Sequence, residues 1–384
     1  MISLKVLDAV KSVLKSTQRV GLHEPIFQGN ELKYLKDCID TTFVSSVGKY
    51  VDQFEKKIAS YVGCKRAVAV VNGTVALQMA LLAVNVSKNN DVIVPSLTFV
   101  ATPNAVSYLG ATPYFCDSDI SCIGYDENLL KELMKKNFEV SCGECRNKET
   151  GKKLGAIVIM HTFGHPSNIE LALKLSFDFK VPIVEDAAES LGSFYQGKHT
   201  GTFGNSAAIS FNGNKIITAG GGGVFLTNDE KMADHIKHLT TTAKTLHKWE
   251  YIHDLIGYNF RMPNLNAALV SAQLEKIEEM VKSKRDLHKS YKKALDGINE
   301  VTLLSEPSNA RSNYWLQTII LRKNNKKLRD KILTDLNKSG LTSRPLWRPM
   351  HLLKPYKKCQ KTTMDNCERL YNSVINIPSS AGLI

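Results

Sequence analysis

The fold is decided by residues 181–223, which read VPIVEDAAESLGSFYQGKHTGTFGNSAAISFNGNKIITAGGGG. Two short apolar segments in this stretch are typical of buried strands. The first is followed by the acids Glu185 and Asp186, and the second by Lys215 and then by four consecutive glycines, residues 220–223. This order places an acid and an amine at the edge of one sheet, since each of them follows a strand.

Together these residues meet the needs of one cofactor, pyridoxal phosphate. Its pyridine nitrogen has to stay protonated for the ring to accept electrons, and a buried acid that faces the nitrogen provides this. Its aldehyde has to be held as an imine, which takes a lysine amine in a pocket with little water. Taken singly, each feature has an ordinary explanation: a Glu-Asp pair caps helices, lysines lie at surfaces, and glycines form turns. Their joint order favours the cofactor site.

The rest of the chain predicts an α/β fold with a mainly parallel sheet and helices on both of its faces, because short apolar segments alternate with helical patterns. The strand-like segments are residues 66–71, 91–95, 111–116, 154–160, 182–184, 207–211 and 224–227. In such a fold the ligand crevice lies outside the carboxyl ends of the strands. Four polar segments fall at such ends: Asn72-Gly-Thr, Thr98-Phe, Met160-His-Thr and Glu185-Asp.

Two of these segments carry specific expectations. Gly73 and Thr74 stand between a strand and a helix, where free backbone N–H groups, the helix dipole and a hydroxyl form a favourable seat for phosphate. An ordinary helix cap is the alternative. Phe99 follows the next strand, so that its ring either stacks on a flat cofactor or belongs to the core.

The chain of 384 residues is long enough for two lobes. A helical pattern over residues 265–295 predicts a connector, so that we expect a large domain at 1–262 and a small domain at 263–384. No apolar run is long enough to cross a bilayer, and residues 1–15 predict an amphipathic helix, not an export signal. We therefore expect a cytoplasmic protein that does not bind membranes.

The eight cysteines agree with that compartment. Only Cys142 and Cys145 form a close pair, which is a weak zinc or redox signal, and two free thiols in a polar loop are the favoured interpretation. His161 and His165 lie near each other without cysteines at metal spacing. We therefore expect no metal site.

The net charge of +13 is unevenly distributed. Residues 1–230 contain 23 basic and 23 acidic side chains, whereas residues 231–384 contain 27 and 14. A basic C-terminal part suits an anionic, nucleotide-linked substrate, and nucleic acid is the weaker alternative because we find no recognition motif. On the helical pattern at 282–293, six basic residues are expected on a solvated face: Lys282, Lys284, Arg285, Lys289, Lys292 and Lys293.

From about His23 to Pro378 the chain resembles the DegT-type nucleotide-sugar aminotransferases, which share the aspartate-aminotransferase fold (fold type I of the pyridoxal-phosphate enzymes). The resemblance implies a large cofactor domain with a mainly parallel sheet and a smaller α+β C-terminal domain. It rests on the combination of TTFVSSVGKYVDQFE, VNGTVALQMAL, PSLTFVATPNAVSYLGATP, HTFGHP, VEDAAESLGS, SFNGNK, GGGG and GYNFRMPNLNAALVSAQLE. Three segments (HTFGHP, SFNGNK and FVSSVGKYVD) are most similar to the branch that aminates UDP- or GDP-linked 4-keto-6-deoxy-N-acetylhexosamines, on the route to bacillosamine- or legionaminic-type sugars.

The resemblance assigns roles residue by residue. It implies that Lys215 and Asp186 are the catalytic residues, the first bonded to the cofactor aldehyde and the second paired with the pyridine nitrogen. It implies that Gly73, Thr74 and Ser210 hold the phosphate.

Four further residues would contact the cofactor. Phe99 would cover one face of the ring. Glu189 stands where many members of the family have His or Gln near the phenolic oxygen, and Asn212 replaces the histidine of the commoner S-F-H-x-x-K form. Asn259 would reach the phosphate of a neighbouring subunit's cofactor, which implies an obligate homodimer with shared active sites.

The implied reaction moves the amino group of L-glutamate, which leaves as 2-oxoglutarate, to the 4-keto carbon of a UDP- or GDP-linked sugar. Lys215 would act as base and acid. Two alternatives are a sugar dehydratase of the same family, which lacks the lysine, and a cofactor-binding regulatory protein without turnover. The choice of nucleotide and the stereochemistry of the new amine stay open. Arg344, Trp347 and His351 are candidates for the substrate lobe, with packing roles equally open.

Overall fold

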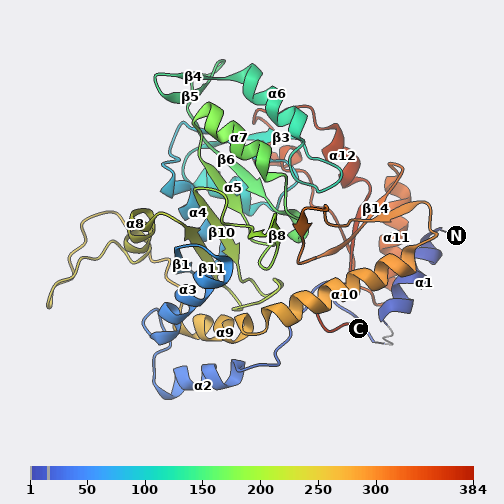
Figure 1. Cartoon of the computed structure of the whole chain (residues 1–384), viewed down its shortest axis with the longest axis horizontal. Helices are drawn as coiled ribbons and strands as arrows, with labels where there is room; N and C mark the ends of the chain where they lie inside the picture. The colour runs from blue at the N-terminus through green and yellow to red at the C-terminus, as the bar shows by residue number, and fades with distance from the viewer. Residues whose placement is uncertain (1, 15–17) are drawn as a thin grey trace.

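The computed structural model describes residues 2–14 and 18–384 and is built around one seven-stranded sheet (Figure 1). Its strands are β1 (Arg66–Val70), β2 (Asp91–Pro95), β3 (Thr112–Cys116), β6 (Leu154–Met160), β7 (Ile183–Asp186), β10 (Ser206–Ser210) and β11 (Gly223–Thr227). They lie in the order β1-β11-β10-β7-β6-β2-β3, and only β11 runs antiparallel to its neighbours. The predicted α/β fold with a mainly parallel sheet is confirmed.

Helices cover both faces of this sheet. One face packs against α4 (Gly73–Ala83), α5 (Ala101–Tyr108) and α8 (Glu230–Thr240). The other packs against α3 (Lys49–Val62) and α9 (Asn264–Leu274) at one end, and α6 (Glu127–Asn137) and α7 (Ile169–Phe179) at the other. Successive residues of a strand point to opposite faces, so that both faces of each strand are buried. This burial explains why the strands are continuous apolar runs.

A second, four-stranded sheet is formed by β12 (Val301–Leu303), β14 (Gln317–Leu321), β15 (Arg344–Pro345) and β16 (Val374–Ile377), in the order β12-β14-β16-β15. It shares a hydrophobic cluster with α1 (Ile2–Leu14), α10 (Ile277–Leu295) and α11 (Lys326–Lys338), whereas α12 (Asp365–Tyr371) packs against the large core. The first helix therefore packs with C-terminal elements. Residues 1 and 15 of the predicted helix lie outside the described residues, and the domain boundary at 262/263 stays a prediction.

Two predicted elements differ in extent. The helical pattern at 265–295 is divided into α9 and α10, which are separated at residues 275–276. The apolar run NYWLQTIIL at residues 313–321 also predicts a strand, but β14 begins only at Gln317 because the preceding residues form a turn in which Tyr314 has a φ of +48°. This turn lies beside the active site described below.

The expectation of a solvated basic face on α10 is wrong for Lys284. Its side chain is fully buried, and its Nζ donates to the backbone carbonyls of Trp315, at 3.1 Å, and Ser379. The physical reason is that the C-terminal segment covers one side of α10, which runs from the large sheet toward α1 and α11 in Figure 1: the carbonyls of Pro378 and Ser379 accept hydrogen bonds from Tyr291 and Lys284. Arg285 is also partly buried, in an ion pair with Glu306.

A hairpin of β4 (Phe138–Ser141) and β5 (Glu144–Asn147) carries the predicted cysteine pair. Cys142 lies exposed in the turn of a hairpin, but Cys145 is buried in its second strand, so only one of the two fits the expected polar loop. All eight cysteines are free thiols. Within residues 2–14 and 18–384, no helix combines the length and apolar character needed to span a bilayer. The other elements are α2 (Glu31–Asp40), β8 (Phe194–Tyr195), β9 (Lys198–His199), β13 (Ala310–Arg311) and short 3₁₀ turns at Thr162–Gly164, Met350–Leu352 and Lys354–Tyr356.

Candidate active site

A cavity of about 300 Å³ lies at the carboxyl edge of the large sheet. Eight residues singled out from the sequence line it together: Gly73, Thr74, Phe99, Asp186, Glu189, Ser210, Asn212 and Lys215. The ninth, Asn259, is exposed and is not among the lining residues; its side chain accepts a hydrogen bond from Arg261. The fold therefore gathers residues that are up to 142 positions apart in the sequence, Gly73 to Lys215, around one space.

Asp186 provides a buried acid in this cavity. It is the last residue of β7, and its carboxylate accepts hydrogen bonds from Thr102 Oγ1, at 2.7 Å, and from the backbone N–H of Ala188, at 3.2 Å. Burial raises the pKa of Asp186, and the hydrogen bond from Thr102 opposes that shift. A cation beside the carboxylate would therefore be strongly favoured.

The neighbouring acid, Glu185, has a different role because it points to the other face of the sheet. Its oxygens accept hydrogen bonds from the backbone N–H groups of residues 201, 203 and 204 and lie 3.0 Å from His161 Nε2. Burial alone would raise its pKa, but these hydrogen bonds lower it overall. Glu185 is therefore a structural residue, and it engages one of the two histidines considered as metal ligands. Within the described part of the chain, no group of acidic, histidine or cysteine side chains could hold a metal ion.

The N-terminus of α4 forms another wall of the cavity. Asn72 caps this helix through its side chain, which accepts from the N–H of Val75 at 2.9 Å. A Cβ atom added to Gly73 would lie 2.6 Å from Cβ of Ser210, so only glycine allows the helix to approach β10 this closely. Free N–H groups of the first helical turn and the hydroxyls of Thr74 and Ser210 thus face one region. This is a suitable set of donors for a phosphate.

Lys215 lies across the cavity, in the turn after β10. Its side chain is 12% exposed, and Nζ lies 3.2 Å from Oε1 of Glu189. The other oxygen of Glu189 accepts the backbone N–H of Phe163 at 2.9 Å; Phe163 has a φ of +57°, in the left-handed region. Burial raises the pKa of Glu189 to about 7, although the Lys215 ammonium opposes that shift. The amine therefore faces a carboxyl group that titrates near neutral pH.

Two tryptophans complete the walls. Trp347, a candidate from the sequence, lines the cavity and packs against Phe163 with ring centroids 4.9 Å apart. Sequence reasoning missed Trp315, whose ring centroid lies 3.9 Å from Lys215 Nζ. Arg344 and His351 do not line the cavity: Arg344 is exposed in β15, and His351 Nδ1 lies 2.7 Å from Ser96 Oγ.

A mainly parallel sheet covered by helices, with a buried acid, a helix N-terminus and a lysine around one cavity, defines a pyridoxal-phosphate enzyme of fold type I. The sequence profile of the DegT/DnrJ/EryC1/StrS aminotransferase family matches residues 25–384, and the chain belongs to this family. This confirms the family predicted from the sequence, together with its cofactor, since the enzymes of this family depend on pyridoxal phosphate.

Individual relatives agree with this membership. The chain is 36% identical over 365 residues to the GDP-perosamine synthase of Escherichia coli O157:H7, covering 95% of this chain and 94% of that protein. It is 32% identical over 372 residues to the putative pyridoxal phosphate-dependent aminotransferase EpsN of Bacillus subtilis, covering 95% and 92%. A DegT DnrJ EryC1 StrS aminotransferase from Brucella abortus superposes with a TM-score of 0.82 at 26% identity, covering 91% and 90% of the two chains.

Proposed function

We propose that the protein is a nucleotide-sugar aminotransferase that moves the amino group of L-glutamate to the 4-keto carbon of a GDP- or UDP-linked 4-keto-6-deoxy hexose. The observation that carries the proposal is the meeting of Lys215 and Asp186 in one cavity with the N-terminus of α4. The relative from E. coli is named for a GDP-linked amino sugar, which favours GDP and a perosamine-like product over the bacillosamine- or legionaminic-type products.

The residues of the cavity fit pyridoxal phosphate. Asp186 would pair with the ring nitrogen, and Gly73, Thr74 and Ser210 would hold the phosphate, since each group meets its chemical complement there. Phe99 and Asn212 line the same space and would contact the ring and its substituents. When bound, the cofactor supplies an electron sink for the negative charge that develops at the substrate carbon.

The protein's own contribution is proton transfer and electrostatics. Lys215 would first bind the cofactor and then, once displaced by a substrate amine, remove and return a proton at the reacting carbon. Glu189, 3.2 Å from Nζ, would stabilise the ammonium form of Lys215 after it has taken the proton. Asp186 would maintain a counter-charge behind the ring, and Trp315 and Trp347 would exclude water.

The partner in this proposal is a second copy of the chain. The loop after α8 projects from the body in Figure 1, and it exposes six large apolar side chains: Leu246, Trp249, Tyr251, Ile252, Leu255 and Ile256. Exposed apolar area of this size usually marks a protein interface. Asn259 follows this loop, and in a homodimer it would complete the partner's cofactor site. A protein that sediments as a monomer at concentrations where it is active would contradict this arrangement.

The decisive experiment offers the purified protein a panel of GDP- and UDP-linked 4-keto-6-deoxy sugars, with and without an N-acetyl group, together with L-glutamate. Mass spectrometry should show an amino sugar nucleotide and an equal amount of 2-oxoglutarate with at least one of them. The dehydratase alternative predicts a deoxygenated sugar instead, and it is disfavoured because Lys215 is present. A cofactor-loaded protein that converts none of the sugars would support the regulatory alternative.

A further inference from the structure

Trp315 contacts Lys215, although the role described for it so far is only to exclude water. The ring centroid of its indole lies 3.9 Å from Nζ, and the indole Nε1–H donates to the carbonyl of Asn214 at 2.7 Å. The residue is 5% exposed. A cation held over an indole face is attracted by the negative charge of the ring face, most strongly where water is excluded. The ammonium of Lys215 therefore has two partners, the Glu189 carboxyl group and the Trp315 ring.

One side chain ties these two partners together. The Asn313 amide nitrogen donates to the backbone carbonyls of Glu189, at 2.9 Å, and Leu191, at 2.8 Å, while its oxygen accepts the N–H of Trp315 at 2.8 Å. Asn313 is fully buried. The segment that carries Glu189 and the residue that carries the indole are thus fixed relative to each other through a single amide.

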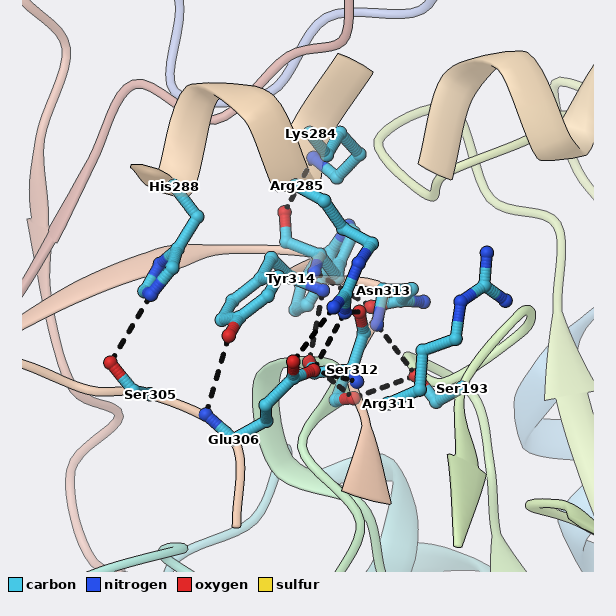
Figure 2. A network of polar contacts seen from close by, with 12 residues as sticks. Ser193, Lys284, Arg285, His288, Ser305, Glu306, Arg311, Ser312, Asn313 and Tyr314 are labelled. Carbon is cyan, nitrogen blue, oxygen red and sulfur yellow. Dashed lines mark hydrogen bonds and ion pairs between the residues drawn. The ribbon is translucent and has the colours of Figure 1, made fainter. Parts of the chain in front are cut away.

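Behind this amide a partly buried polar network connects the turn to helix α10 (Figure 2). Arg285 forms a bidentate ion pair with Glu306, with N–O distances of 2.6 and 2.7 Å, and also donates to the carbonyl of Ser312 at 2.8 Å. Glu306 in turn accepts the N–H of Ser312. The pair therefore holds both backbone groups of a residue three positions before Trp315.

The buried Lys284 acts on the other side of the same turn. It donates to the carbonyl of Trp315 at 3.1 Å and to that of Ser379, and no carboxylate accepts from it within the described residues. A buried amine without a counter-ion is costly, and burial lowers the pKa of Lys284 well below its ordinary value. An apolar side chain would pack there at less cost, so the amine is best explained by the carbonyls that it holds.

We propose that Trp315 is a positioning residue for Lys215: its indole face holds the amine beside Glu189, and the α10 network of Lys284, Arg285 and Glu306 sets the place of that face. The inference rests on the proposed function, because it concerns the amine that binds the cofactor. According to this inference, the reactivity of Lys215 depends on residues 284–315 as well as on the edge of the large sheet.

The test is the pH dependence of the rate at which cofactor-free protein bonds to added pyridoxal phosphate, followed by absorbance in a stopped-flow instrument. The free amine reacts and the ammonium does not, so the rate rises with pH to a plateau. Trp315→Leu keeps an apolar side chain but loses the ring face, and the midpoint should fall by about 0.5 to 1 pH unit. Trp315→Phe retains a ring face and should restore most of that shift.

A distal variant extends the test. Glu306→Gln should lower the midpoint in the same direction by a smaller amount, whereas Asp286→Asn, which removes an exposed ion pair one residue from Arg285, should not move it. Thermal unfolding of each variant checks that it is folded. Equal midpoints in the wild type, Trp315→Leu and Trp315→Phe would overturn the inference, even if all rates fell together. A wild-type protein that forms no bond to pyridoxal phosphate would instead overturn the proposed function.

Discussion

Among residues 2–14 and 18–384, two lysines are withdrawn from solvent, and they are held in opposite ways. Lys215 lies in a cavity, 3.2 Å from a carboxylate and over an indole face. Lys284 lies on the buried side of α10, where it donates to two backbone carbonyls and where burial lowers its pKa. The first amine has partners that favour its charge and space for a ligand. The backbone carbonyls around Lys284 can accept hydrogen bonds from a neutral amine, and the fully buried side chain has no space beside it for a ligand.

Under the proposed function, the contrast separates a lysine that takes part in the chemistry from a lysine that stabilises the fold. The pKa of Glu189, the carboxyl group beside Lys215, is raised to about 7, so this group can gain and lose a proton near neutral pH within hydrogen-bonding distance of the amine, which suits a site of proton transfer. A lysine that only donates to carbonyls is a fixed part of the packing. Because Lys284 holds Trp315 and Trp315 holds Lys215, the two regions are nevertheless in contact.

The largest expected effect comes from removing the chemically used amine. Lys215→Ala should lower turnover at least about a thousandfold, because both the bond to the cofactor and the proton transfer depend on the amine. Formation of the amino sugar nucleotide, measured by mass spectrometry, checks this. Borohydride treatment should fix labelled cofactor to the wild type and not to the variant. Substantial turnover by Lys215→Ala would refute the assignment of the amine.

Glu189→Gln should change how stability depends on pH. The pKa of Glu189 is raised to about 7 in the fold, above the ordinary value of 4.5, so the folded state binds the proton more tightly than the unfolded state. Its stabilising effect is present below pH 4.5 and is lost as the pH rises through 7. Between pH 4.5 and pH 7 the free energy of unfolding of the wild type should fall by up to about 3 kcal/mol relative to that of the variant. Urea unfolding of the cofactor-free proteins measures this, and parallel pH profiles would disprove it.

The parts of the site that lie at strand ends were predictable from the sequence. Asp186, Thr74 and Lys215 each follow a short apolar run, and parallel strands bring their carboxyl ends to one edge. The order of strands and polar residues along the chain was sufficient to predict these residues, because a parallel sheet brings the residues that follow its strands close together. Glu185 shows the limit of this reasoning, since only the alternation of the strand decides which of two adjacent acids enters the cavity.

The missed residues depend on contacts between distant segments. Trp315 stands in a turn 100 positions after Lys215, and no periodicity marks it. Lys284 did leave a signal. It continues the buried stripe of α10, which comprises Ile277, Met280, Val281, Lys284, Leu287, His288, Tyr291 and Leu295. Spacing of three and four residues placed it with the core, and the charge of its side chain led to the opposite interpretation.

Lys284→Met should produce a pH effect of the opposite sign to Glu189→Gln. The pKa of Lys284 is lowered in the fold by burial, so the unfolded state binds the extra proton and the wild type gains stability as the pH rises. The variant lacks this gain, which amounts to about 1.4 kcal/mol per pH unit while the lysine is neutral only in the folded state. Urea unfolding between pH 8 and about pH 9.5 measures the difference. A constant difference across that range would mean that Lys284 is charged in the fold.

The smallest effect is expected at Lys289, five residues along the same helix. Its ion pair with Asp286 is exposed on both sides, so that solvent screens the attraction and the long side chain gains little from being held. Lys289→Ala should change the free energy of unfolding by less than about 0.5 kcal/mol and leave turnover unaltered. Because it shares the helix and the residue type with Lys284, it isolates burial as the cause of the larger effect. If Lys289→Ala changed the free energy of unfolding as much as Lys284→Met does, the burial of Lys284 could not be the cause of the larger effect.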